Sequence, residues 1–253
     1  MIRVDSSSPQ DIVQLAIETT GRLGSVAVLR GQRVIRQTNL DPKTRTAATL
    51  APEVDRQLRW CRESQNWPSL VSVADGPGSF TGLRIGVTTA KTLCYALDLP
   101  LVSVDSLAAI SAAAMLEHSQ AQKVWVCLDA YRGQVFAGKF DRSWLLPDIH
   151  AIPGDWTAHP AAVDVISLKA WCQWRTEKPA DVLLAGDEKP LRSTEGIDSI
   201  SAENDVLGRT CDAVGVGMLG LRAAMMNQSI DPLSLVPRYL KVSAAEEKLA
   251  GEG

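Results

Sequence analysis

A glycine-rich turn between a strand and a helix constrains the fold of this 253-residue chain more than any other feature. Residues 75–86 read DGPGSFTGLRIG. The apolar run 70–74 before them predicts a buried strand, and an apolar helical pattern follows to about Leu97. The two glycines at the turn permit positive φ or a close backbone approach, and Ser79 or Thr81 can cap the helix. We therefore expect a strand, a tight turn and a helix start.

This turn admits two interpretations, and the sequence leaves both open. The free N–H groups of a helix start can hold a phosphate, with Gly76, Gly78 and Ser79 as contacts. Alternatively, the glycines only allow the helix to pack tightly on its strand. The spacing matches neither the Walker A motif nor G-x-G-x-x-G.

The helix that follows carries a row of small residues. Gly82, Gly86, Ala90 and Cys94 recur at four-residue steps. Such a row allows unusually close contact, and a helix that is apolar nearly all round is buried on more than one side. The helix either lies deep in its own domain or covers its sheet and also meets a partner.

The first half of the chain alternates strands and helices. Three strands joined by short glycine-containing turns predict an antiparallel meander, and strands and helices alternate after it. The expected strands are 12–19, 25–29, 34–38, 70–75 and 101–104, and the expected helices are about 46–64, 80–97 and 107–117. This order matches one lobe of the actin–Hsp70–sugar-kinase (ASKHA) fold.

The second half has a weaker pattern that echoes the first without a clean repeat. We expect strands at 124–130, 134–140 and 182–187, helices at 167–175 and 206–227, and an extended end at 232–242, whereas 141–165 has no clear pattern. The fold class is thus α/β and two-lobed, with mixed sheets flanked by helices. The expected divisions are a tail at 1–10, lobes at 11–107 and 108–242, and a tail at 243–253.

Composition narrows the function classes. The net charge is −3 and no run of Lys and Arg occurs, so binding to nucleic acid would need a partner or a local patch. Five scattered cysteines without C-x-x-C favour reduced thiols in the cytoplasm. The polar start does not resemble a signal peptide, and no segment approaches the roughly 18 apolar residues of a membrane span.

The sequence offers no convincing catalytic or metal-binding residue. His118, His150 and His159 have no ligand spacing and are interpreted as surface histidines. Ser79 does not lie in G-x-S-x-G. Glu18 ends the first expected strand, where sugar-kinase-like folds place an acid near the metal of a nucleotide. A short motif of this kind has low specificity, so a strand-end hydrogen-bond acceptor is the favoured interpretation.

Four motifs in order resemble the TsaB (YeaZ) family of the glycoprotease-like superfamily. The resemblance spans roughly residues 14–242, and Glu18 stands where the family commonly has Asp. The motifs are LAIETT at 15–20, GPGSFTGLRIG at 76–86, LDAYRGQVF at 128–136 and VPRYLK at 236–241.

The resemblance implies a non-catalytic subunit. It would bind and stabilise a TsaD-type catalytic paralogue through the helices at about 47–64 and 80–97, and would form a homodimer when alone. With a TsaE-type ATPase, the assembly transfers a threonylcarbamoyl group to the adenosine beside the tRNA anticodon. The chain would reach tRNA only through this complex. The interface candidates are Leu50, Val54, Leu58, Gly82, Arg84, Gly86, Ala90 and Lys91.

Nucleotide binding and catalysis complete these expectations. No cofactor is expected on the chain alone, and ATP or ADP is expected at an interface of the assembled complex. The candidate contacts are Glu18, Gly76, Gly78 and Ser79. The alternative function is an enzyme of the same fold, such as a small-molecule kinase or a glycoprotease-like hydrolase.

Overall fold

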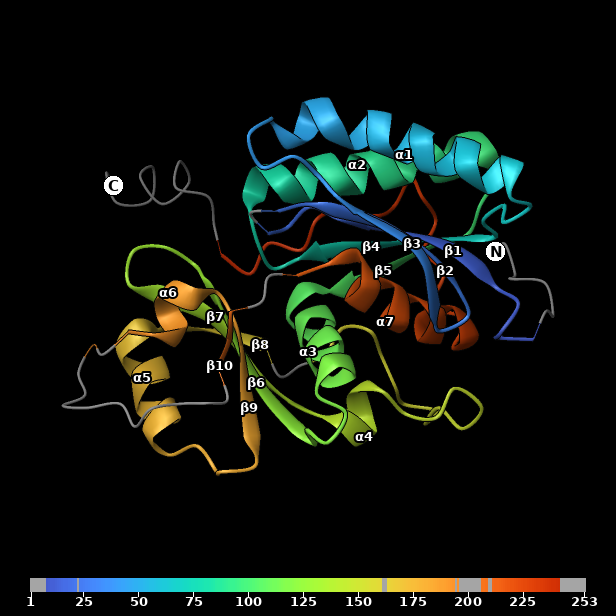
Figure 1. Cartoon of the computed structure of the whole chain (residues 1–253). Coiled ribbons are helices and arrows are strands. Elements are labelled where there is room, and N and C mark those ends of the chain that lie inside the picture. The colour runs from blue at the N-terminus through green and yellow to red at the C-terminus, as the bar shows by residue number, and fades with distance from the viewer. Residues whose placement is uncertain are drawn as a thin grey trace.

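The described residues form two lobes, each built on a mixed sheet. The computed structural model describes residues 8–21, 23–160, 163–193, 195, 206–208 and 211–241. Within these ranges the strands form two five-stranded sheets, with helices between the sheets and on their outer faces (Figure 1). The expected two-lobed ASKHA fold is confirmed.

The first sheet has the strand order β3-β2-β1-β4-β5. Its strands are β1 (Val13–Glu18), β2 (Ser25–Arg30), β3 (Arg33–Asn39), β4 (Leu70–Gly76) and β5 (Leu101–Asp105). The first three strands pair antiparallel, as expected for a meander, and β4 and β5 add in parallel to β1. β1 is therefore the central strand, buried on both faces.

The second sheet repeats this plan. Its strands are β6 (Lys123–Asp129), β7 (Gln134–Asp141), β8 (Val163–Ser167), β9 (Val182–Gly186) and β10 (Val206–Gly208). The strand order is β10-β9-β6-β7-β8. Read from the other end, it is the order of the first sheet with every number raised by five, and the strand directions match as well. The structure thus contains a repeat that the sequence shows only as an echo.

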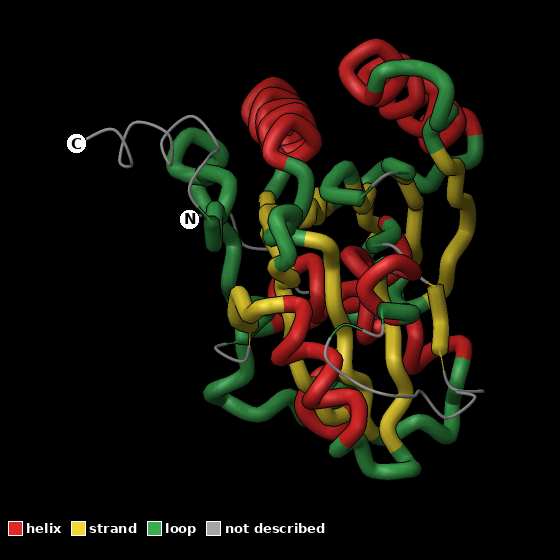
Figure 2. Tube along the Cα trace, turned by 90° about the vertical axis from the view of Figure 1, so that its left-hand side faces the viewer, coloured by secondary structure: helices red, strands yellow, loops and turns green. Residues whose placement is uncertain are grey.

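The helices separate into an inner pair and outer ones. α3 (Ser106–Glu117) and α7 (Ala213–Met225) lie between the two sheets (Figure 1). α1 (Thr46–Glu63) and α2 (Phe80–Leu97) lie on the outer face of the first sheet, and Figure 2 shows them together at one end of the molecule. The second lobe carries the shorter α4 (Arg142–Leu145), α5 (Leu168–Thr176) and α6 (Glu188–Leu191).

The inner helix α7 packs closely on its neighbours because it has glycines at the points of contact. A Cβ at Gly215 would lie 2.1 Å from the carbonyl oxygen of Ala109 in α3. A Cβ at Gly220 would lie 2.1 Å from Oγ of Ser72 in β4. α7 therefore returns to the first sheet although it follows the second, and it joins the two lobes into one core.

Several boundaries differ from the sequence expectation. The long helix expected at 206–227 is wrong, because β10 occupies its start and α7 begins after Asp212, whose side chain accepts from Gly215 N at 2.9 Å. The segment 141–165 contains α4 and the start of β8. The expected lobe division at 107/108 falls inside α3.

The ends of the chain lie partly outside this description. Residues 1–7 and 242–253 of the expected tails are not among the described residues. We call residues 230–241 the C-terminal strap; they run without a helix or strand along the first lobe. Among the described residues, no helix is long and apolar enough to cross a membrane.

Replacing Gly215 with alanine tests the close packing of the inner helices. Alanine favours an isolated helix over glycine, but here its methyl group would collide with the backbone of α3. We expect Gly215→Ala to lower the free energy of unfolding by about 2 kcal/mol in urea titrations. Gly154→Ala, which has open space around it, is the matched control and should change stability little. Equal stability of the two variants would contradict the packing.

Candidate functional site

A cavity of about 570 Å³ opens between the two lobes. The turn before α2 and the end of β1 form one wall, the second lobe forms the opposite wall, and the C-terminal strap closes one side. The lining residues are Thr20, Gly21, Pro77, Gly78, Ser79, Phe80, Thr81, Leu83, Leu128, Asp129, Tyr131, Arg132, Phe136, Asp187, Arg238, Tyr239, Leu240 and Lys241.

The glycine-rich turn is held against the chain's own backbone. Ser79 N donates to Thr20 O at 2.9 Å, and Ser79 Oγ caps α2 by accepting from Gly82 N at 3.3 Å. Gly78 has φ 157°, and a Cβ there would lie 2.7 Å from Thr20 O. Gly76 has φ 133°, and its Cβ would lie 2.4 Å from the carbonyl oxygen of Arg238. These contacts support the packing interpretation of the two glycines.

Glu18 lies buried beneath this cavity and not among its lining residues. Its Oε1 accepts from Thr20 N, from Thr20 Oγ1 at 2.6 Å and from Gly21 N at 3.0 Å. Its Oε2 is buried and has no hydrogen-bond partner among the residues that the structure describes. Burial raises the pKa of Glu18 to about 7, against the opposing effect of the bonds from Thr20 and Gly21. The interpretation as a strand-end acceptor is confirmed.

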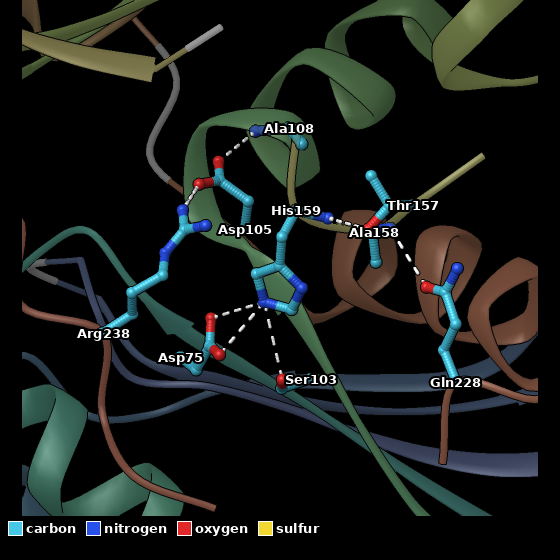
Figure 3. A network of polar contacts seen from close by, with 9 residues as sticks. All are labelled: Asp75, Ser103, Asp105, Ala108, Thr157, Ala158, His159, Gln228 and Arg238. Carbon is cyan, nitrogen blue, oxygen red and sulfur yellow. Dashed lines mark hydrogen bonds and ion pairs between the residues drawn. The ribbon is translucent and has the colours of Figure 1, made fainter. Parts of the chain in front are cut away.

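A second polar group joins both lobes behind the turn (Figure 3). His159 Nε2 lies 3.0 Å from both carboxylate oxygens of Asp75, at the end of β4, and 3.5 Å from Ser103 Oγ. The guanidinium of Arg238 forms an ion pair with the fully buried Asp105, and the backbone N–H of Arg238 donates to the backbone oxygen of Asp75 at 2.7 Å. The strap, the first sheet and the loop carrying His159 thus meet at one point.

Asp105 also begins α3. Its Oδ1 accepts from Ala108 N at 2.9 Å and caps the helix. Burial raises the pKa of Asp105 to about 6, although the charge of Arg238 opposes this rise. The pair therefore holds the strap to the helix that connects the two lobes.

This polar group does not have the geometry of a Ser-His-Asp triad. In a triad one ring nitrogen serves the carboxylate and the other serves the nucleophile. Here the same atom, His159 Nε2, faces both Asp75 and Ser103. Among the described residues no group of three His, Cys, Asp or Glu side chains could hold a metal ion.

Sequence reasoning missed the contacts of Asp75, Asp105, His159 and Arg238. His159 was expected to be a surface residue, yet it pairs with Asp75 and its side chain is only 26% exposed. Asp75 and Asp105 lie at the ends of two neighbouring strands of the first sheet. This shared position is the signal in the sequence that could have indicated a polar group there. Nothing local in the sequence indicates that His159 and Arg238 reach them.

The structure corrects the reason given for the helix interface. A Cβ at Gly82 would lie 1.9 Å from Thr19 O, and one at Gly86 would lie 2.1 Å from Thr19 Oγ1. Ala90 is buried in the core of the same lobe. The row of small residues therefore admits the end of β1 and not a partner helix.

The other interface candidates divide in a similar way. In α1, Leu50 and Val54 are buried in the first lobe and Leu58 is half-buried against the same core. In α2, Arg84 Nε donates to Tyr239 Oη at 3.0 Å, and Lys91 Nζ donates to Leu235 O at 2.6 Å. The expected polar edge thus binds the chain's own strap.

Comparison with family models and curated proteins points to tRNA modification. The model of TsaD, described as tRNA N6-adenosine threonylcarbamoyltransferase, matches residues 44–163. The chain is 29% identical to the tRNA threonylcarbamoyladenosine biosynthesis protein TsaB of Bacillus subtilis, over 92% of this chain and 96% of that protein. It is 32% identical to TsaB of Haemophilus influenzae, over 55% of this chain and 58% of that protein.

Solved structures show the same fold. YeaZ from Pseudomonas aeruginosa superposes with a TM-score of 0.69 at 21% identity, covering 90% of this chain and all of that one. A protein from the same organism, described as similar to peptidase YEAZ, gives a TM-score of 0.68 at 20% identity, over 91% of this chain and all of that one.

The buried Glu18 predicts a pH-dependent stability. Because its pKa is raised from 4.5 to about 7 by folding, its contribution to stability is complete below pH 4.5 and is lost as the pH rises through 7. Between pH 4.5 and pH 8, the unfolding free energy of the wild type should fall. We expect this fall to be smaller by about 3 kcal/mol in Glu18→Gln, which cannot titrate at this position. Asp105 contributes in the same direction and remains in the variant. An unchanged pH profile would contradict the buried state of Glu18.

Proposed function

We propose, from its similarity to the TsaB (YeaZ) family, that the chain is a non-catalytic subunit in threonylcarbamoylation of tRNA. In this proposal it binds and stabilises a TsaD-type catalytic subunit. A TsaE-type ATPase joins the pair, and the assembly modifies the adenosine beside the anticodon. The reaction would take place on the TsaD-type subunit.

The observation that carries the proposal is the uncovered outer face of α1 and α2. Both helices bury one side in the first lobe and leave the other exposed at one end of the molecule (Figure 2). Apart from Arg84, which donates to Tyr239 of the strap, the exposed stripe of α2 has uncharged side chains, and that of the first half of α1 has alanines and a proline. These residues are Thr81, Thr88, Thr92 and Tyr95 of α2, and Ala47, Ala48, Ala51 and Pro52 of α1.

This composition suits a protein partner. The centre of a protein interface is depleted of charged residues and enriched in tyrosine. Tyr95 is 71% exposed, so a partner would bury an aromatic side chain that the chain leaves in water. Short side chains also allow a second pair of helices to approach. The same surface can form a two-fold homodimer when the TsaD-type subunit is absent.

We propose that an adenine nucleotide binds at an interface of the assembled complex and not to the free chain. The glycines of the turn, which could otherwise admit a phosphate, contact Thr20 and the strap. The cavity lining also offers no excess of positive charge to attract phosphates, because Asp129 and Asp187 balance Arg132 and Lys241, and Arg238 is paired with Asp105. Isothermal titration with Mg·ATP should therefore give heat of binding with the complex and none with the free chain.

The alternative of an enzyme of the same fold has less support. A hydrolase or kinase needs a general base near a substrate position. His159 contacts Asp75 at the start of the turn, so its Nε2 is already engaged, and the residue is not among those that line the cavity. Activity of the free chain on ATP or a peptide that disappears in His159→Ala would favour the enzyme.

Charged substitutions on the exposed stripe test the subunit proposal. Thr88→Arg with Thr92→Arg places two charges in the proposed interface without entering the core. We expect affinity for the same organism's TsaD-type protein to fall at least about tenfold, which corresponds to about 1.4 kcal/mol. Co-purification and titration calorimetry measure the effect.

A control in the second lobe makes this test specific. Lys169→Arg with Gln173→Arg changes exposed positions on α5 in the second lobe and should leave binding unchanged. Gly86→Leu is unsuitable, because its side chain would collide with Thr19 inside the lobe. If the Thr88→Arg, Thr92→Arg variant bound the TsaD-type protein as well as the wild type does, the proposed surface would be overturned. If the wild type did not bind that protein, the proposed function would be overturned.

A further inference from the structure

The first lobe concentrates positive charge in a chain that is negative overall. Residues 30–67 contain eight Lys and Arg against four Asp and Glu, a balance of +4, while the whole chain carries −3. Three of the four acids are engaged locally: Glu53 by Arg56, Asp55 by Arg59 at 2.9 Å, and Asp41 by its own turn. Glu63 is the remaining acid of this segment, so an excess of arginine is left at the surface.

A β-bulge turns two of these arginines to the same side of the sheet. Arg33 and Arg36 are three residues apart and would point to opposite faces of a regular strand. The register between β2 and β3 shifts, so that Arg33 pairs with Arg30 and Arg36 pairs with Val28. Arg30 and Val28 are two residues apart and share a face. Arg30, Arg33 and Arg36 therefore lie on one face, the one that α1 covers.

The end of α1 adds a fourth arginine and two tryptophans. Arg36 lies over the ring of Trp60 at 5.3 Å, and Arg62 lies over the ring of Trp67 at 5.4 Å. Arg30 Nη2 donates to Asn66 Oδ1 at 2.8 Å. We call Arg30, Arg33, Arg36 and Arg62 the arginine patch.

The contacts of Arg30, Arg36 and Arg62 orient their guanidinium groups without neutralising them. The partners of Arg36 and Arg62 are aromatic rings, and the partner of Arg30 is an amide. In the part of the chain that the structure describes, none of the four forms an ion pair with a carboxylate. Trp67 is 40% exposed beside Arg62. Positioned arginines interleaved with aromatic rings suit a ligand that carries both phosphates and stacking bases.

We propose that the arginine patch contacts the phosphate backbone of tRNA in the assembled complex. This inference rests on the proposed function and adds to it a direct contact, since the chain was otherwise expected to reach tRNA only through its partner. RNA is favoured over an anionic membrane because the patch is small, flanked by Glu63, and includes a partly exposed tryptophan that can stack on a base.

The test compares two triple variants with equal net charge. The first is Arg30→Gln, Arg33→Gln and Arg62→Gln; the second, in the second lobe, is Lys169→Gln, Lys189→Gln and Arg192→Gln, all exposed residues. Each is combined with the TsaD-type subunit and titrated against a fluorescent, unmodified tRNA transcript by anisotropy at several salt concentrations. Co-purification of the complex and circular dichroism confirm that each variant is folded and assembled.

The expected result is specific to the patch. The first triple should weaken tRNA binding at least about tenfold and make the slope of log K against log salt shallower by about two to three. The second triple should bind within about twofold of the wild type.

Other outcomes overturn the inference. If the first triple variant bound tRNA with wild-type affinity, a phosphate contact at the arginine patch would be excluded. If both triple variants lost affinity equally, the effect would come from net charge and not from the patch. Loss of binding to phosphatidylglycerol vesicles with tRNA binding intact would assign the patch to a membrane. Failure of the wild type to co-purify with the TsaD-type subunit would instead overturn the proposed function, and a titration of the free chain with the same tRNA would then test the patch by itself.

Discussion

The close contact between α2 and the end of β1 determines the arrangement of the first lobe. Thr19 fills the space where Gly82 and Gly86 lack side chains, and its hydroxyl donates to Gly82 O at 2.8 Å. The backbone oxygen of the next residue, Thr20, accepts a hydrogen bond from Ser79 N and so holds the turn before α2. Because the small residues of α2 face inward, its outer face carries threonines and Tyr95, with Arg84 bound to the strap. The residues that make the motif recognisable serve packing within the lobe, and the surface that we propose for a partner is the other side of the same helix.

The C-terminal strap is the second constraint on the site. Tyr239 stacks on Phe80 at 4.6 Å between ring centroids, and Lys241 Nζ donates to Ala130 O in the second lobe at 3.1 Å. Together with the Arg238–Asp105 ion pair, these contacts join α2, the inner helix α3 and the second lobe. The cavity between the lobes is therefore closed on one side by the chain itself.

Local patterns in the sequence predicted the strands of the first lobe, α2 and a cap at Ser79 or Thr81, of which the structure shows Ser79, because each depends on neighbouring residues. The expectation of a helix from 206 failed at β10, since glycine-rich apolar sequence does not distinguish a buried strand from a closely packed helix. The pair of Asp75 and His159 joins residues 84 positions apart, which no local pattern reveals. The arginine patch was hidden for two reasons: its members are dispersed along the chain, and a bulge changes the face that they occupy.

The most direct test of the central claim is the reactivity of a thiol placed on the outer face of α2. All five native cysteines are buried, and burial raises the pKa of Cys61 to about 11 and of Cys94 to about 12, so they react slowly. Thr88→Cys adds one exposed thiol in the proposed interface, and Gln173→Cys adds one on α5 as the control. The account predicts that the TsaD-type subunit slows maleimide labelling of the first at least about tenfold and leaves the second unchanged. Equal labelling of Thr88→Cys with and without a bound partner would contradict it.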